Sequence, residues 1–308
     1  MIRKYYLLLL LISSAITFTA CSNDDSNGGK FSEDGPNVNK NVVTDDEAVT
    51  RLEFPRLKDD GNSVVIVYRT SNKTYDPDRV NYAVEWDCEK KSQRWSCYQM
   101  HKGYSGTYSR VTNNYMNDTQ NLPKGSYWEN DYYEYPPYEH GHICPNADRK
   151  YSYDANFQTF YLTNMQPQYH KFNGFTDENN KRREGLWYRM EEKVRDWSPQ
   201  NSTDTMYVCK GGTIDREDQI IERVSGKLIV PKYFFMACLM KNSQGYRAVG
   251  FWAEQKSNEW RDDQPLSDFA VTIDELEELT GIDFFCNLPD DIENYVENHF
   301  STKAWGLD

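Results

Sequence analysis

Two of the five histidines in this 308-residue chain lie on either side of one glycine, in the stretch YEHGH at 138–142. A histidine side chain titrates near neutral pH, so His142 could take a proton from water as a general base. On a strand, alternate residues point to one face, which would bring His140, His142 and Cys144 together. Such a group could instead hold Zn²⁺ or Cu²⁺. Both chemistries are open at this point.

Two further motifs follow this stretch. The segment YLTNMQPQ at 161–168 contains Asn164, and Asn173 comes nine residues after it. The segment GLWYRME at 185–191 ends in Glu191. Phosphodiester hydrolysis needs an activated water, a cation beside the phosphate and a proton for the leaving oxygen. Oxygen ligands such as amides and carboxylates are those that Mg²⁺ prefers, and it often takes only one or two from the protein.

The order of the three motifs resembles that of the DNA/RNA non-specific endonucleases of the ββα-metal (His-Me finger) type, which include endonuclease G. The signature of that family is roughly D-R-G-H-x-x-P, then S/T-N-x-x-P-Q, then an asparagine and G-x-W-x-x-L-E. The resemblance covers the chain from about Asn81 to about Trp252. It implies an enzyme that hydrolyses phosphodiester bonds of DNA, RNA or both without sequence specificity. It also implies one Mg²⁺ cofactor, with Mn²⁺ or Ca²⁺ as alternatives.

The resemblance assigns a role to each matching residue. His142 corresponds to the general base that activates water. Asn173 corresponds to the asparagine that binds the metal, and Glu191 to the glutamate that binds a metal-bound water and assists the leaving group. Asn164 corresponds to the asparagine that organises the catalytic site by hydrogen bonds, although an ordinary turn role suits this residue equally well.

The chain departs from the family pattern where Glu139-His140 replaces Asp-Arg. The family arginine contacts substrate phosphate with a bidentate fork, whereas histidine is shorter and mostly neutral above about pH 6.5. His140 could still donate one hydrogen bond to substrate. Alternatively, Arg110, Arg149 or Lys150 could supply the missing contact. The departure also leaves open a degenerate nuclease without activity.

A second departure is the long insert GFTDENNKRRE between Asn173 and Gly185. Lys181, Arg182 and Arg183 form a small basic cluster in it. These cations could clamp the phosphate backbone and position the substrate without reading its sequence. They could equally form a solvated loop.

The net charge of −13 is concentrated at the two ends of the chain. Residues 261–308 contain thirteen acids and two bases, whereas residues 51–260 contain 28 acids and 29 bases. The part that carries the histidine motif is therefore almost neutral. A negative total weakens long-range attraction of a polyanion but does not exclude nucleic acid as the substrate.

The N-terminus predicts export and lipid anchoring. Residues 1–20 have a charged start, a short apolar run and small residues before Cys21, and this end resembles a bacterial lipobox. Lipidation of Cys21 would anchor the protein to the bacterial envelope, with the outer-membrane surface as one candidate location. An ordinary signal peptide is the alternative. Residues 21–50 are expected to form a flexible acidic tether, and residues 51–308 the endonuclease domain.

Six cysteines remain after Cys21, and an even number in an exported chain suggests disulfides. Cys88 and Cys97 are close enough in sequence to close a hairpin. Cys209 and Cys238 lie in two apolar runs that could be neighbouring strands. The sequence alone does not decide the pairing.

Hydrophobic patterns predict an α+β fold with a mixed, mainly antiparallel sheet and few helices, to which the resemblance adds a ββα-metal finger. Long polar and aromatic loops are expected over 101–140. The predicted helices are 184–197, a short one between the Thr272 capping box and Gly281, and 291–300. The predicted strands are 62–70, 82–86, 95–100, 157–164, 206–209, 232–240 and 247–253.

Two functions from other classes compete with the nuclease. A metal-binding surface lipoprotein without catalysis would use the alternating histidine and cysteine side chains. A glycan-binding surface lipoprotein would use some of the eight tryptophans and 23 tyrosines as stacking platforms. No ordered motif supports the second reading, and most of these aromatic residues are expected in the core. The oligomeric state is left open.

Overall fold

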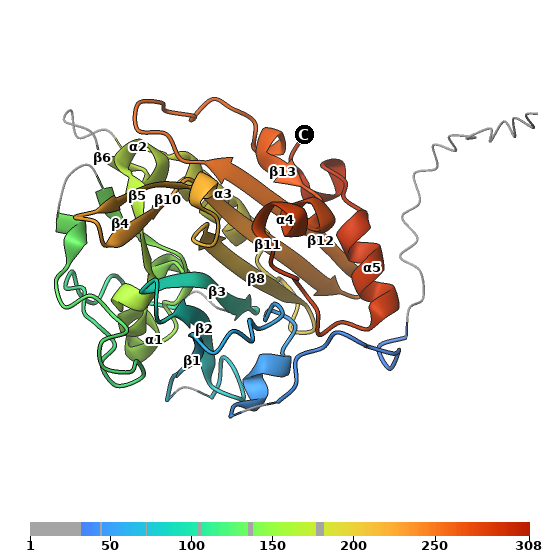
Figure 1. Ribbon diagram of the computed structural model, residues 1–308. Coiled ribbons are helices and arrows are strands. Elements are labelled where there is room, and N and C mark those ends of the chain that lie inside the picture. Colours follow the sequence, from blue (N-terminus) through green and yellow to red (C-terminus); the bar gives the residue numbers. More distant parts are fainter. Residues whose placement is uncertain (1–31, 44, 72, 104–105, 135–137, 177–181) are drawn as a thin grey trace, which may run out of the picture.

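The computed structural model describes residues 32–43, 45–71, 73–103, 106–134, 138–176 and 182–308. Its centre is a seven-stranded antiparallel sheet with the order β1-β2-β3-β8-β11-β12-β13 (Figure 1). The strands are β1 (Ser63–Arg69), β2 (Val80–Asp87), β3 (Ser92–Met100), β8 (Thr205–Gly212), β11 (Tyr233–Asn242), β12 (Gly245–Glu254) and β13 (Ala270–Val271). The α+β class and the mainly antiparallel sheet are confirmed.

Both faces of this sheet are buried. Along β11, Phe234 and Met236 pack into one core cluster, while Phe235 and Ala237 between them pack into the other. This alternation follows from the two-residue period of a strand, and it explains why β11 is apolar on both sides. The helices therefore form two separate layers, one on each face.

The first layer contains the predicted finger. A hairpin of β4 (Tyr138–His142) and β5 (Met165–Tyr169) leads into the short helix α2 (His170–Asn173), and α3 (Leu186–Asp196) packs beside it. The apolar stripe of α3 faces the sheet and is buried through Leu186, Trp187, Met190 and Val194. Smaller elements complete this layer: α1 (Tyr153–Gln158), β6 (Phe175–Thr176), β7 (Arg182–Arg183), and a hairpin of β9 (Ile220–Val224) with β10 (Leu228–Pro231).

The second layer consists of α4 (Ile273–Thr280) and α5 (Asp290–Asn298), on the opposite face of the sheet. In Figure 1 they lie in front of the sheet, and α3 lies behind it. The predicted capping box is present, because Thr272 and Glu275 bond each other's backbone N–H groups. Gly281 ends α4 with a φ of 71°, a conformation that favours glycine.

The described part of the expected tether packs on the domain. Ala48 and Val49 are buried in the core of the second layer, and Asn41 is buried with hydrogen bonds to Val49 O and Pro55 O. A short 3₁₀ turn covers Glu47–Thr50. These contacts tie residues 41–49 to the domain, and the start of the domain at residue 51 stays a prediction. Residues 1–31, including the predicted signal and Cys21, lie outside the described residues.

One predicted strand is absent. Residues 157–164 instead contain the end of α1 and a 3₁₀ turn at Leu162–Asn164. The Ser152 side chain caps α1 by accepting a hydrogen bond from the Ala155 N–H. The apolar residues of FQTFYLTN thus pack as a helix end and a turn, although their composition favours a strand.

The six described cysteines are all free thiols, and five of them are buried. Cys97 and Cys209 are cross-strand neighbours of β3 and β8, while Cys238 faces Val208. Neither suggested pair, Cys88 with Cys97 or Cys209 with Cys238, is bridged. In the described part of the chain, no helix is both long and apolar enough to span a bilayer.

Candidate active site

His142 is the last residue of β4, where the finger meets the first turn of α3. The Trp187 indole N–H donates to the His142 carbonyl at 3.2 Å and so joins the hairpin to the helix. Gly141 allows close packing on β5, because an added Cβ would lie 2.3 Å from the Gln168 side chain. These contacts fix the position of the His142 backbone.

The His142 side chain is held among aromatic rings. Phe160 presents its ring at 86° to the imidazole with centroids 5.1 Å apart, and Tyr115 lies 6.1 Å away. Burial, followed by the positive charge of Arg110, lowers the pKa of His142 to about 3. The imidazole is therefore neutral near pH 7. Its buried Nε2 has no hydrogen-bond partner among the described residues.

Asn173 ends α2, which follows directly on β5 and packs against both β4 and α3. The contact with α3 is close, since a Cβ on Gly185 would lie 2.2 Å from the Phe172 carbonyl oxygen. Asn173 is half-buried, and its amide makes no hydrogen bond with a described residue. The fold thus gathers the elements that carry His142 and Asn173 into one finger.

Glu191 lies inside the protein with 9% of its surface exposed. Its Oε1 is 3.3 Å from Nζ of Lys210, a lysine of β8 with no exposed surface. Burial raises the pKa of Glu191, and the charge of Lys210 opposes that rise. In this conformation Glu191 is part of a buried ion pair. Its expected contact with a metal-bound water stays a prediction.

Asn164 has no exposed surface, and its side chain holds the loop that follows the finger histidine. Its Oδ1 accepts from the Cys144 N–H at 2.8 Å, and its Nδ2 donates to the carbonyls of Cys144 and Thr159. These bonds fit the organising role that the family resemblance implies. A contact between Asn164 and substrate does not fit this burial.

Arg149 was expected at the substrate, but its side chain points inward. It has no exposed surface, its Nη2 donates to the Gln99 carbonyl, and its guanidinium lies 4.4 Å from the centre of the Tyr98 ring. In this conformation the guanidinium does not reach the surface, and a contact with a substrate phosphate stays a prediction. The physical reason is that the aromatic core beside β3 encloses the whole side chain.

His140 is held in a different way from His142. Its ring is stacked between Tyr115 and Tyr133, with centroid distances of 3.7 and 4.5 Å. Its Nε2 is 2.8 Å from Oδ2 of Asp131. The residue that replaces the family arginine is therefore committed to neighbours in the protein, and a substrate contact for it stays a prediction.

The side chain of Arg110, one of the predicted substrate-binding residues, is exposed and lies near His142. Its guanidinium lies 4.6 Å from the centre of the Phe160 ring, the ring that also contacts His142. It donates to Asn113 Oδ1 and, at 2.8 Å, to the Tyr115 hydroxyl. Lys181 lies outside the described residues. Arg182 and Arg183 form the two-residue strand β7 paired with β6.

Lys210 was not identified from the sequence. The sequence feature that could have revealed it is a single lysine within the strand MYVCKGG, since a charge in an otherwise buried strand needs a partner. Its Nζ also lies 5.0 Å from the centre of the Trp187 ring. A neighbouring ion pair joins Arg195 to buried Asp148 at 3.1 Å. These buried charges form a polar layer between α3 and the sheet.

The alternative transition-metal site is not supported. Among the described residues, His140, His142 and Cys144 do not bring three ligand atoms within 4.8 Å of one another. Burial raises the pKa of the Cys144 thiol to about 12, which disfavours the thiolate that Zn²⁺ requires.

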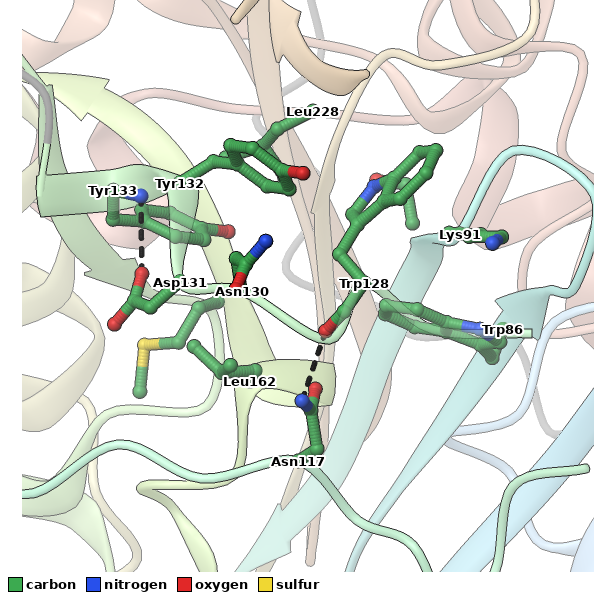
Figure 2. Close-up of a pocket in the computed structure, with 12 residues that line it drawn as sticks. Trp86, Lys91, Asn117, Trp128, Asn130, Asp131, Tyr132, Tyr133, Leu162 and Leu228 are labelled. Carbon is green, nitrogen blue, oxygen red and sulfur yellow. Dashed lines mark hydrogen bonds between the residues drawn. The ribbon is translucent and has the colours of Figure 1, made fainter. Parts of the chain in front are cut away.

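An aromatic pocket adjoins His140. Figure 2 shows Asp131 and Tyr133, which contact that histidine, together with Trp86, Trp128 and Tyr132. Its cavity measures about 20 Å³, which is space for roughly one water molecule. A sugar ring or a nucleobase does not fit there. Within this pocket, the rings of Trp128 and Tyr132 pack edge to face, with centroids 6.1 Å apart.

Comparison with known proteins places the chain in one family. The model of the DNA/RNA non-specific endonuclease family matches residues 60–291. A nuclease of Nostoc sp. is 28% identical over 70% of this chain and 75% of its own length. The mitochondrial nuclease EXOG of Xenopus laevis is 27% identical over 69% of this chain and 58% of its own. The chain thus spans little more than half of that mitochondrial relative.

A chain in the crystal structure of the EndoG/EndoGI complex has the same fold. It superposes with a TM-score of 0.58 over 80% of this chain and 94% of its own length, at 18% identity. The family match covers the sheet and the finger with His142, Asn173 and Glu191. The chain therefore belongs to the DNA/RNA non-specific endonuclease family.

Proposed function

We propose that this protein is a metal-dependent endonuclease in which His142 is the general base. The observation that carries the proposal is a buried imidazole that stays neutral at physiological pH and whose Nε2 has no partner in the described part of the chain. A base must be unprotonated and free to accept, and both conditions are met at this atom. His142 would take a proton from the attacking water.

The donor set of the finger suits a hard divalent ion. Asn173 offers an amide oxygen without a partner among the described residues, and Mg²⁺ often takes few protein ligands. We propose Mg²⁺ at Asn173, with Mn²⁺ and Ca²⁺ as alternatives and with Glu191 reached through water. When bound, the ion would supply positive charge beside the phosphate. Trp187 and Asn164 would keep the finger in place while His142 moves the proton.

Arg110 is proposed as the phosphate contact that replaces the family arginine. It is exposed, it is positioned by Phe160 and Tyr115, and its charge acts on His142. A guanidinium binds phosphate oxygens with two parallel N–H groups, which His140 is not able to do. The contact would fix the substrate without reading its bases.

We further propose DNA and RNA as substrates, with no sequence preference. The proposal includes export and an envelope anchor through lipidated Cys21, on the strength of the lipobox-like sequence. Mass spectrometry of the membrane fraction would test the anchor by detecting a diacylglyceryl-modified N-terminal cysteine. A mature protein that begins elsewhere would refute it.

The activity is tested with supercoiled plasmid and with structured RNA, each with Mg²⁺ and with EDTA. His142→Ala should lower the cleavage rate by about 10²–10⁴ because the proton acceptor is removed. His299→Ala is the matched control, since His299 is exposed beyond α5 and bonds the Tyr295 carbonyl. Normal cleavage by His142→Ala would refute the base assignment. Intact nucleic acid with the unaltered protein would favour a degenerate nuclease.

A further inference from the structure

Two lysines from separate segments of the chain meet over one tryptophan ring beside the finger. Lys91 lies in the turn between β2 and β3, and its Nζ is 4.3 Å from the centre of the Trp128 ring (Figure 2). Lys227 lies in the turn of the β9–β10 hairpin, and its Nζ is 5.6 Å from the same centre. It also donates to the Tyr132 hydroxyl at 2.9 Å. We call Lys91, Lys227 and Trp128 the two-lysine site.

The positive charges of the two-lysine site are accessible and are not neutralised by nearby acids. Lys227 is exposed, Lys91 is half-buried, and neither forms an ion pair with an acidic residue in the described part of the chain. By contrast, Lys90 in the same turn pairs with Asp87 at 3.3 Å. Glu129, next to Trp128 in the chain, is an acidic neighbour, and it is exposed. The site therefore presents more positive than negative charge to the solvent.

A small aromatic cluster connects the two-lysine site to the candidate active site. Tyr115, Trp128 and Tyr132 pack against the same small core. The Tyr115 hydroxyl is the group that accepts the hydrogen bond from Arg110. In Figure 1 the β9–β10 hairpin lies beside β4 and β5, and β10 packs against β5. The fold thus mounts both lysines on the aromatic cluster that also positions the proposed phosphate contact.

The arrangement of the two ammonium groups suits an anion at the surface. A cation over a tryptophan ring is a common stabilising contact. Two cations near the same ring also repel each other, and an anion beside them would remove that repulsion. The adjoining cavity has space for roughly one water molecule, so a nucleobase does not enter it. Lysine binds phosphate as a point charge, and such contacts position a nucleic acid without reading its bases.

We propose that Lys91 and Lys227 form a second phosphate-binding site for the nucleic-acid substrate, separate from the contact at Arg110. The proposal rests on the proposed nuclease function, since that function brings a polyanionic strand to the finger. The site holds a backbone phosphate away from the bond that is cleaved, so it adds affinity without touching the reacting atoms. Trp128 and Tyr132 keep the two ammonium groups in position. The lysines are therefore positioning residues for the substrate.

The test is equilibrium binding of a fluorescein-labelled DNA duplex to the full chain carrying His142→Ala, in EDTA, measured by fluorescence anisotropy. Adding Lys91→Met and Lys227→Met removes both charges but keeps apolar side chains against the rings. The affinity should fall roughly tenfold or more at low salt, and the slope of log Kd against log salt should fall by about 2. Lys40→Met with Lys303→Met changes the net charge equally at exposed positions and should leave both quantities unchanged.

Charge and packing are separated by Lys91→Arg with Lys227→Arg, which keeps both charges and should restore the affinity. Circular dichroism checks folding, and Lys227→Met alone, at an exposed position, should lower the salt slope by about 1 if the double variant does not fold. An unchanged salt slope in the methionine variants would overturn the proposal, as would arginine variants that bind as weakly as these. Plasmid cleavage is measured separately with the unaltered chain. DNA binding with the expected losses but without cleavage would support the second phosphate site and refute the nuclease function.

Discussion

His140 and His142 lie two residues apart on β4, but their side chains have different uses. The His140 ring is fully engaged by Tyr115, Tyr133 and Asp131. Burial tends to raise the pKa of Asp131, but its hydrogen bond with His140 lowers it overall. The His142 Nε2 atom is left without a partner among the described residues. One histidine therefore joins Tyr115 to Tyr133, and the other remains the predicted general base.

The sequence motif predicted the roles of His142, Asn173 and Glu191, because the family resemblance supplied their order. It did not reveal that Arg149 points inward, since the core beside Tyr98 is built from segments distant in sequence. Nor did it distinguish Arg110 from the other cations. That distinction depends on Phe160, which meets Arg110 only after folding.

The Arg110 proposal predicts a change in substrate binding. Arg110→Ala should raise KM roughly tenfold at low salt, or about 1.4 kcal/mol, with a smaller effect on kcat. The slope of log KM against log salt should fall by about 1, because one phosphate contact is lost. The measurement is steady-state cleavage between low and physiological salt.

Two further variants test whether the effect on KM comes from the charge and the geometry of the Arg110 side chain. Arg110→Lys keeps the charge and should restore part of the salt slope but not the full affinity, since the fork geometry is lost. Arg216→Ala removes another exposed arginine, one paired with Asp218 at 2.9 Å, and should behave as the unaltered enzyme. An unchanged salt slope in Arg110→Ala would count against a phosphate contact.

At the scale of elements, strong periodic patterns predicted α3, α4, β1 and β11 within one or two residues. The segment 157–164 was mistaken for a strand, because its apolar composition carries no information about the Ser152 cap or the bonds made by Asn164. The ion pair of Lys210 with Glu191 was also unforeseen, since it joins β8 to α3 through tertiary packing.

This ion pair predicts an asymmetric effect of mutation. Lys210→Met should lower the free energy of unfolding by about 3–5 kcal/mol, because it removes the ion-pair partner of the buried Glu191 carboxylate. The double variant with Glu191→Gln removes both charges and should recover much of that loss. Urea unfolding of the four proteins in a double-mutant cycle measures the coupling.

The rate of plasmid cleavage distinguishes a role of Glu191 in the reaction from its role as the ion-pair partner of Lys210. If this carboxylate also serves the reaction, the stable double variant should remain slow in plasmid cleavage. Full activity of the double variant would show that Glu191 acts only as the partner of Lys210. A coupling energy near zero would refute the ion pair itself.

At the scale of the whole molecule, the sheet separates two polar regions, one with cationic side chains and one with carboxylates. The finger face carries Arg110 and the buried Lys210 beside a neutral imidazole. The α5 face carries a group of neighbouring carboxylates, namely Asp274, Glu277, Asp283, Glu293 and Glu297. The excess of acids in 261–308 was visible in the sequence, but its convergence on one cavity was not. That convergence needs α4, α5 and the segment around Asn39 to meet.

The buried carboxylates of α4 and α5 predict that the protein loses stability as the pH rises. Glu277, Glu293 and Glu297 have folded-state pKa values raised from 4.5 to about 8, 7 and 9. Between pH 4.5 and 9 the folded state therefore binds more protons than the unfolded state, and stability falls with rising pH. Thermal unfolding in EDTA from pH 5 to 9 measures this loss.

Asp274, Asp283 and Asp290 add to the repulsion in this region, and Arg56 opposes it at Asp283. Glu297→Gln removes one of the raised groups, so its Tm should fall less steeply with pH than that of the unaltered protein. Glu278→Gln, an exposed change of the same charge on α4, should retain the original slope. The same slope in all three proteins would argue against the raised pKa values of these carboxylates.

The segment at 37–41 is tied to the far end of the chain by several bonds. Asn37 donates to the Cys286 carbonyl, the Val38 N–H donates to Asp290, and the Asn41 N–H donates to Asn287. A mechanical pull on the chain upstream of residue 37 would therefore be borne first by the loop before α5 and by α5 itself. The force would act on the candidate active site only after these hydrogen bonds had broken.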